Sequence, residues 1–320
     1  MSRRSDLKVN NLSVSFLQVT NCVSQSGLFS SLCRLDLRNS RLNRVSSESC
    51  FAVGCYQITV KKSKFSAWYR GGIIDERETV VGNGEFSDVI FSNLTDSRVF
   101  NIDNPESSLK LERCRFDSVV VSSICAPVSV VKCFVAHIDF TCFHFCSGIN
   151  EAASFRFASH DSEYVFDVSV NKTSEFCCGM GKSKWSSYAG GIQSFAYFHN
   201  NHTKTKVTKR RSGICLTKYP AGIETVSYYR SADGEGFGIF SIHAYQAGEM
   251  LASKIDLVNH TVLNNDGLLE LYHNFKAKLT DFNFVLNSKQ RWLASSSDGT
   301  NSVTLSRCFI VGEHPYLSDR

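Results

Sequence analysis

Short apolar segments with one shared pattern recur along the chain. Each contains an apolar residue, any residue, a second apolar residue, two polar residues, Ser or Cys, any residue and an apolar residue. Close matches are LDLRNSRL (35–42), ITVKKSKF (58–65), LKLERCRF (109–116) and VSVVKCFV (128–135). Looser matches lie at 255–262, 277–284 and 303–310, and FSDVIFSN (86–93) is a degenerate unit. The alternation inside each unit predicts a strand with one buried face.

The spacing of these units predicts the fold. Successive units begin about 19–26 residues apart when the degenerate unit is counted. A unit of this length cannot bury its apolar face alone, but stacked units pair each strand with its copy about 4.8 Å away. We therefore expect an all-β protein, a right-handed parallel β-helix (solenoid) with rungs of about 19–26 residues. We expect a single domain over residues 1–320, less regular around 147–190.

The Ser or Cys of each unit is expected at a tight inward corner, where a large side chain would clash with its copies above and below. The main alternative fold is a leucine-rich repeat horseshoe, because LCRLDLRNSRL (32–42) matches the leucine-rich pattern. The other units lack its first leucine, and polar, turn-like stretches rather than helical patterns follow the strands. These differences favour the β-helix.

Composition sets further bounds. Of the 320 residues 42% are hydrophobic and 20% charged, as in folded proteins, and the 24 Phe and 11 Tyr favour strands. The net charge of +5 is too small to indicate a dedicated polyanion partner. No apolar segment has the length of a membrane span, and no signal-peptide pattern begins the chain. We therefore expect no membrane span, and the residues alone leave the compartment open.

The 13 cysteines are an odd number and lack zinc-ribbon spacing. They are expected to act as small buried apolar residues. We predict no metal site and no other cofactor.

One motif is spelled twice, as KSKFSAWYRGGI (62–73) and KSKWSSYAGGI (182–192). We interpret both copies as the same part of a rung: a small inward Ser, an aromatic corner, and glycines that turn the chain into the next strand. Exposed aromatic side chains in rows could instead stack on sugar rings. The candidate ligand-binding residues are therefore Trp68, Tyr69, Arg70, Trp185 and Tyr188.

These repeats resemble those of polymorphic membrane protein-like surface proteins of bacterial and protist parasites. The likeness rests on Gly71-Gly72-Ile73 and Gly190-Gly191-Ile192, similar to a G-G-A-I element, and on FHNN (198–201) and FVLN (284–287), similar to an F-x-x-N element. The resemblance implies a pectin-lyase-like β-helix used for adhesion or display, at the cell surface or secreted. It implies no catalytic set.

Catalytic alternatives receive little support from the residues. An enzyme acting on acidic polysaccharides needs carboxylates that project together from neighbouring rungs. The acidic pairs are Asp75 with Glu76, whose side chains point to opposite faces of a strand, and Asp233 with Glu235 in a Gly-rich turn. Cys142 and His144 would share one strand face, but packing is the favoured interpretation. We predict no catalytic residues.

The strongest charge feature is the basic run NHTKTKVTKRRSG. Its Lys209, Arg210 and Arg211 are further candidate ligand-binding residues, although a solvated face is the favoured interpretation. No nucleic-acid-binding module accompanies the run, so we expect no specific nucleic-acid partner. The sequence therefore favours a non-enzymatic repeat scaffold that binds a glycan or a host or cell-surface protein. The alternative is a carbohydrate-active enzyme, a lyase or hydrolase of the pectin-lyase-like type.

Overall fold

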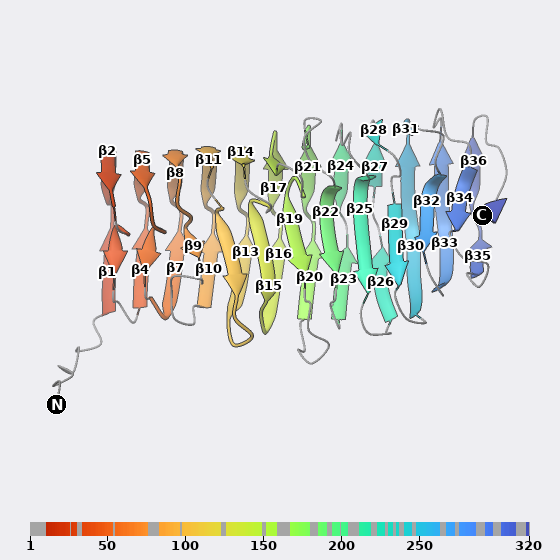
Figure 1. The fold of residues 1–320 in the computed structure, drawn as a ribbon, viewed down its shortest axis with the longest axis horizontal. Helices are drawn as coiled ribbons and strands as arrows, with labels where there is room; N and C mark the ends of the chain where they lie inside the picture. The colour runs from red at the N-terminus through yellow and green to blue at the C-terminus, as the bar shows by residue number, and fades with distance from the viewer. Residues whose placement is uncertain are drawn as a thin grey trace.

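The computed structural model is a parallel β-solenoid, in which strands stack rung upon rung along one axis (Figure 1). It describes residues 11–25, 27–30, 34–53, 55–75, 83–96, 98–122, 126–148, 152–158, 167–179, 185–190, 194–198, 200–203, 211–218, 223–227, 230–232, 235–236, 240–244, 248–262, 267–272, 275–285, 292–296, 302–311 and 318–319. These residues contain strands and no helix. The predicted all-β parallel class is confirmed, and the helices of a leucine-rich repeat are absent from the described chain.

The strands fall into three columns. The first column contains β1 (Asn11–Ser15), β4 (Arg34–Arg38), β7 (Gln57–Lys61), β10 (Asn83–Ser87), β13 (Ser108–Glu112), β16 (Val135–Asp139), β20 (Asp167–Asn171), β23 (Ser194–Phe198), β26 (Ile223–Ser227), β30 (Gly248–Val258), β33 (Phe275–Val285) and β35 (Ser302–Ser306). The second contains β2 (Gln18–Ser24), β5 (Arg41–Ser47), β8 (Lys64–Tyr69), β11 (Ile90–Thr95), β14 (Arg115–Val121), β17 (Cys142–His144), β18 (Ser147–Gly148), β21 (Ser174–Phe176), β24 (Asn201–Thr203), β27 (Arg230–Ala232) and β36 (Phe309–Val311). Because β30 and β33 continue from the first column into the second, these strands form one 23-stranded sheet.

The third column is a separate 10-stranded sheet. It contains β9 (Ile74–Asp75), β12 (Phe100–Asp103), β15 (Val128–Lys132), β19 (Phe155–Ala158), β22 (Trp185–Gly190), β25 (Arg211–Lys218), β29 (Phe240–Ala244), β32 (Gly267–Tyr272), β34 (Trp292–Ser296) and β37 (Ser318–Asp319). Two short pairs complete the strands, β3 (Phe29–Ser30) with β6 (Ala52–Val53) and β28 (Glu235–Gly236) with β31 (Thr261–Val262).

The register of the first column gives the length of each rung. Asn11 pairs with Arg34 and Arg34 with Gln57, so the first rungs are 23 residues long. Val135 pairs with Asp167, which makes that rung 32 residues long. The predicted length of 19–26 residues describes the N-terminal rungs, and later rungs lengthen because their connecting segments do.

Two of the seven pattern matches lie outside the first column. VSVVKCFV (128–135) includes β15 of the third column, and the in-register partner of Leu111 is Ile138 rather than Val130. The match at 255–262 begins in the part of β30 that pairs with β27, in the second column. One pattern marks different corners because each corner needs an outward residue with positive φ followed by a buried residue.

The corner between the first two columns, named the first corner here, is built from left-handed residues other than glycine. Their φ values lie between 49° and 61° at Phe16, Asn39, Lys62, Asp88, Arg113, Phe140, Lys172, Lys254, Asp281 and Arg307. Such a conformation is uncommon for residues with a Cβ. It is therefore a repeated feature of the solenoid, which the sequence does not mark with glycine.

The inward Ser positions of the first corner form a hydrogen-bond ladder. The Ser40 hydroxyl accepts the backbone N–H of Leu17, and the Ser63 hydroxyl accepts that of Ser40, both at 3.1 Å. Each hydroxyl also donates to a carbonyl two residues earlier, at 2.8 and 2.9 Å. The predicted inward burial is confirmed, with Ser40 and Ser63 in the core. The observed reason includes the pairing of buried backbone groups as well as the small size of Ser.

Cysteine occupies the same kind of position on other rungs. The thiols of Cys114, Cys146, Cys178 and Cys308 each donate to the carbonyl two residues earlier, at 3.6 Å. Most of the ten described cysteines are buried, and none of the ten forms a disulfide. The prediction of small buried cysteines is thus confirmed, and these thiols additionally act as weak hydrogen-bond donors.

A stack of phenylalanines fills the interior beneath the second column. The rings of Phe65, Phe91, Phe116 and Phe143 follow one another on successive rungs, with centroid separations of 5.5, 4.8 and 4.6 Å. In-register pairing places identical side chains one rung apart, where aromatic rings stack in parallel. This explains much of the demand for Phe.

Candidate ligand-binding groove

The two copies of the aromatic motif do not occupy the same part of the rung. The first copy supplies β8 in the second column, whereas Trp185 begins β22 in the third column. The interpretation of the copies as equivalent rung segments is therefore wrong. Local composition is shared, but the chain reaches the two positions through different corners.

Trp68 is a core residue, 1% exposed, packed against Phe51 and Phe65 at ring separations of 6.1 and 6.0 Å. Its indole Nε1 has no hydrogen-bond partner among the described residues. The neighbouring Tyr69 points outward, 43% exposed, with the Arg70 guanidinium 5.3 Å from its ring centroid. Of the first motif, Tyr69 and Arg70 are thus on the surface.

The glycines of the first copy are required by close backbone approach. Gly71 has a φ of 58°, and a Cβ added to it would lie 2.1 Å from the carbonyl oxygen of Ser49. A Cβ on Gly72 would lie 2.3 Å from the carbonyl oxygen of Arg98. The turn into the third column therefore admits no side chain at either position.

The second aromatic motif and the basic run meet in the third column. Trp185 on β22 is in register with Arg211 on β25, and Tyr188 is in register with Cys215. Lys209 and Arg210 lie outside the described residues, and for the other three candidates only the strand positions are described. The structure thus brings together Trp185 and Arg211, which are far apart in sequence.

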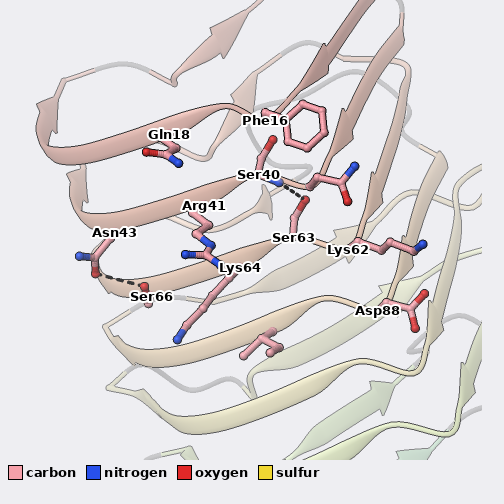
Figure 2. A pocket seen from close by; sticks show the side chains of 12 residues that line it. Phe16, Gln18, Ser40, Arg41, Asn43, Lys62, Ser63, Lys64, Ser66 and Asp88 are labelled. Carbon is pink, nitrogen blue, oxygen red and sulfur yellow. Dashed lines mark hydrogen bonds between the residues drawn. The ribbon is translucent and has the colours of Figure 1, made fainter.

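A groove lies along the first corner and the outward face of the second column, near the N-terminal end of the described chain (Figure 2). Its volume is about 970 Å³, and it is lined by Phe16, Gln18, Asn39, Ser40, Arg41, Asn43, Lys62, Ser63, Lys64, Ser66, Asp88 and Ile90. Every residue of this lining comes from the repeating corner or from outward positions of β2, β5, β8 and β11. The groove is therefore a direct product of the rung geometry.

Three cations line this groove. Arg41 and Lys64 are in register on β5 and β8, and both are exposed. In-register strands lie about 4.8 Å apart, so the two charged side chains leave neighbouring points of the surface. Lys62 projects from the corner beside them (Figure 2). Within the described chain, no carboxylate forms an ion pair with Arg41 or Lys64.

The one carboxylate in the lining is already engaged. The Asp88 oxygens accept hydrogen bonds from Arg113 Nε at 2.7 Å and Nη2 at 3.1 Å. This bonding, with a smaller contribution from Lys62, holds the pKa of Asp88 below its usual range. Asp88 thus stays ionised, but its charge is balanced by Arg113, and the lining keeps an excess of positive charge.

Neutral polar groups in the groove are held by hydrogen bonds between rungs. Asn43 Oδ1 accepts a hydrogen bond from Ser66 Oγ at 3.1 Å, drawn as a dashed line in Figure 2. This bond fixes the orientation of the Asn43 amide. The groove therefore combines mobile cations with an oriented amide, a donor-rich set suited to oxygen-bearing anions.

The outward row of the second column continues beyond the groove. Lys64 is followed in register by Ile90, Arg115 and Cys142 on β11, β14 and β17. Beside this row, His144 Nδ1 lies 3.3 Å from Asp117 Oδ1, and the His144 ring stacks on Phe176 at 5.0 Å. Sequence reasoning did not predict this surface cluster; its only sign was that Cys142 and His144 share a strand face.

The cluster around Cys142 does not have the properties of a nucleophilic site. Burial raises the pKa of the Cys142 thiol, although Arg115 lowers it, so the thiol is protonated at neutral pH. Such a thiol is a weak nucleophile.

The candidate acidic pairs are only partly described. Asp75 ends β9 and Glu235 lies in β28, while Glu76 and Asp233 lie outside the described residues. Within the described chain, no cluster of three His, Cys, Asp or Glu side chains could hold a metal ion. Among those same residues, no helix is long and apolar enough to cross a membrane.

Comparison with known proteins leaves the fold as the basis for assigning function. No family model, curated protein or solved structure matches the chain.

Proposed function

We propose that this protein is a non-enzymatic β-solenoid scaffold that binds an acidic glycan in the groove of its N-terminal rungs. The observation that carries the proposal is the in-register pair Arg41 and Lys64, reinforced by Lys62, in a groove of about 970 Å³. Two cations one rung apart match the repeated negative charges of a uronate or sulfated chain. The side-chain amides supply donors and acceptors for hydroxyl groups.

A binding role is favoured over catalysis by the chemistry of the lining. Glycoside cleavage by general acid and base needs two carboxyl groups on either side of the scissile bond. The groove lining contains only Asp88, and Arg113 engages both of its oxygens. Adhesion or surface display, as implied by the resemblance to polymorphic membrane protein-like repeats, is the setting that we propose for such a scaffold.

The test is calorimetric titration with an oligogalacturonate and with its neutral, carboxyl-reduced counterpart. We expect binding of the acidic oligomer only, with affinity that falls as salt screens the charges. The double variant Arg41→Gln/Lys64→Gln should lose about tenfold or more in affinity, equivalent to roughly 1.4 kcal/mol.

The matched control is Lys278→Gln, which removes one charge from an exposed position on β33, far along the solenoid. This control should bind like the wild type. Equal binding of the acidic and neutral oligomers, or wild-type affinity in the double variant, would contradict the proposal. Binding of an acidic protein but of no glycan would replace the glycan with a protein partner at the same groove.

A further inference from the structure

Cys146 and Cys178 occupy equivalent inward positions on adjacent rungs. The in-register pairs Cys142 with Ser174 and His144 with Phe176 lead directly toward them. Beyond the strand ends, the Phe145 N–H donates to the Phe176 carbonyl at 3.0 Å and the Gly179 N–H to the Cys146 carbonyl at 2.8 Å. These bonds continue the parallel ladder on both sides of the two cysteines.

The two thiols face the same enclosed space. Both residues are fully buried. The Cys146 thiol is also a hydrogen-bonding neighbour of the Cys178 thiol. In-register parallel strands hold Cα atoms about 4.8 Å apart, which lies inside the range of about 4.4–6.8 Å found for disulfides. Backbone rearrangement is therefore unnecessary for a bond between the two sulfurs.

We propose that Cys146 and Cys178 are a disulfide site, which closes into a covalent bond between rungs when the chain folds in the presence of a small-molecule disulfide. One cysteine thiolate attacks a sulfur of oxidised glutathione, and one glutathione thiolate leaves. The second cysteine thiolate then attacks the protein sulfur of the mixed disulfide and releases the other glutathione. The two protein thiols are oxidised, and one glutathione disulfide is reduced to two thiols.

The buried environment decides when the reaction occurs. Burial raises the pKa of the Cys178 thiol well above its ordinary value, and the neighbouring Cys146 thiol adds to this shift. Exchange requires a thiolate and an approach path for the oxidant. Both are available before the two rungs close and are suppressed afterwards, so the bond forms during folding and then resists reduction.

Two nearby cysteines provide matched controls. Cys142 lies opposite Ser174, and the ladder places Cys177 opposite Phe145, so neither has a cysteine partner in register. Trypsin separates the proposed partners, because Cys146 falls in peptide 133–156 and Cys178 in peptide 173–182.

The experiment refolds the full chain from denaturant in a glutathione redox buffer, blocks free thiols with iodoacetamide and maps tryptic peptides by tandem mass spectrometry. We expect peptides 133–156 and 173–182 to be linked through Cys146 and Cys178. The link should persist in Cys142→Ser and Cys177→Ser and disappear in Cys146→Ser and Cys178→Ser. Linkage through Cys142 or Cys177, or full alkylation of both proposed partners in folded protein, would overturn the proposal.

A second measurement does not depend on refolding. Chain that was purified reduced and never unfolded is incubated with oxidised glutathione, and the linked peptide is followed over time. We expect slow linkage, which accelerates at denaturant concentrations that open the rungs without unfolding the whole chain. Absence of the linked peptide at every denaturant concentration would also overturn the proposal.

Discussion

Arg113 and Asp88 occupy the same first-corner position on adjacent rungs and are joined by two hydrogen bonds of 2.7 and 3.1 Å. Arg307 and Asp281 repeat this relationship 26 residues apart near the other end, at 2.6 and 2.9 Å. The positive φ of the corner turns each side chain outward, and the parallel register places it beside its neighbour one rung away. At this corner the solenoid therefore links its rungs through surface charge as well as through the core.

The first prediction concerns acid stability. The Arg113 hydrogen bonds lower the pKa of Asp88, and Arg307 does the same for Asp281. A lowered folded-state pKa contributes stability above the unfolded pKa, near 3.9, and that contribution is lost as the pH falls through the folded value. The double variant Asp88→Asn/Asp281→Asn should therefore show a weaker loss of stability below about pH 4 in urea titrations. The exposed Glu106→Gln is the control, and an unchanged acid slope in the double variant would count against the prediction.

The second prediction concerns the Ser ladder. Ser63→Ala leaves the buried backbone N–H of Ser40 without its acceptor. Loss of a buried partner costs about 1–3 kcal/mol in the free energy of unfolding, measured by urea denaturation. Ser66→Ala, on the outward face of the same strand, should cost less than about 0.5 kcal/mol. Equal effects in the two variants would mean that the ladder adds no specific stability.

The third prediction separates packing from binding at Trp68. Trp68→Ala removes a fully buried ring and should destabilise the fold by about 3–5 kcal/mol, whereas Trp68→Phe should cost less. Because Trp68 is not part of the groove lining, the folded variants should bind oligogalacturonate with wild-type affinity. Tyr69→Ala, at the exposed neighbouring position, is the stability control. A selective loss of ligand affinity in Trp68→Phe at full stability would restore the stacking hypothesis.

The fourth prediction concerns alkaline pH. Burial raises the pKa of the Cys114 thiol to about 12. In the unfolded chain this thiol ionises near pH 9, so its contribution is complete below that pH and is lost as the pH rises toward 12. Between pH 8 and pH 10 the wild type should lose about 1–2 kcal/mol more than Cys114→Ser. Denaturant titrations at several pH values test this, and parallel losses in the two proteins would refute it.

The sequence by itself determined the class of fold and the kind of residue inside it. Alternating apolar positions and a recurring Ser or Cys were enough to predict stacked parallel strands, because each rung repeats the same requirement for a buried face and a small inward residue. In the same way, GGI at 71–73 marked a real backbone constraint, since a Cβ at Gly71 would clash with the Ser49 carbonyl.

Only the tertiary structure decided which column each segment joins and which residues meet. Trp68 and Trp185 sit in similar local sequences, yet one lies in the second column and the other in the third, because connecting segments of variable length shift the register between rungs. The groove cations Arg41 and Lys64 are ordinary polar positions in the sequence, and they become neighbours only through parallel pairing at a distance of 23 residues. Local pattern fixes which face of a strand is buried, whereas the partner across the rung depends on the length of everything between.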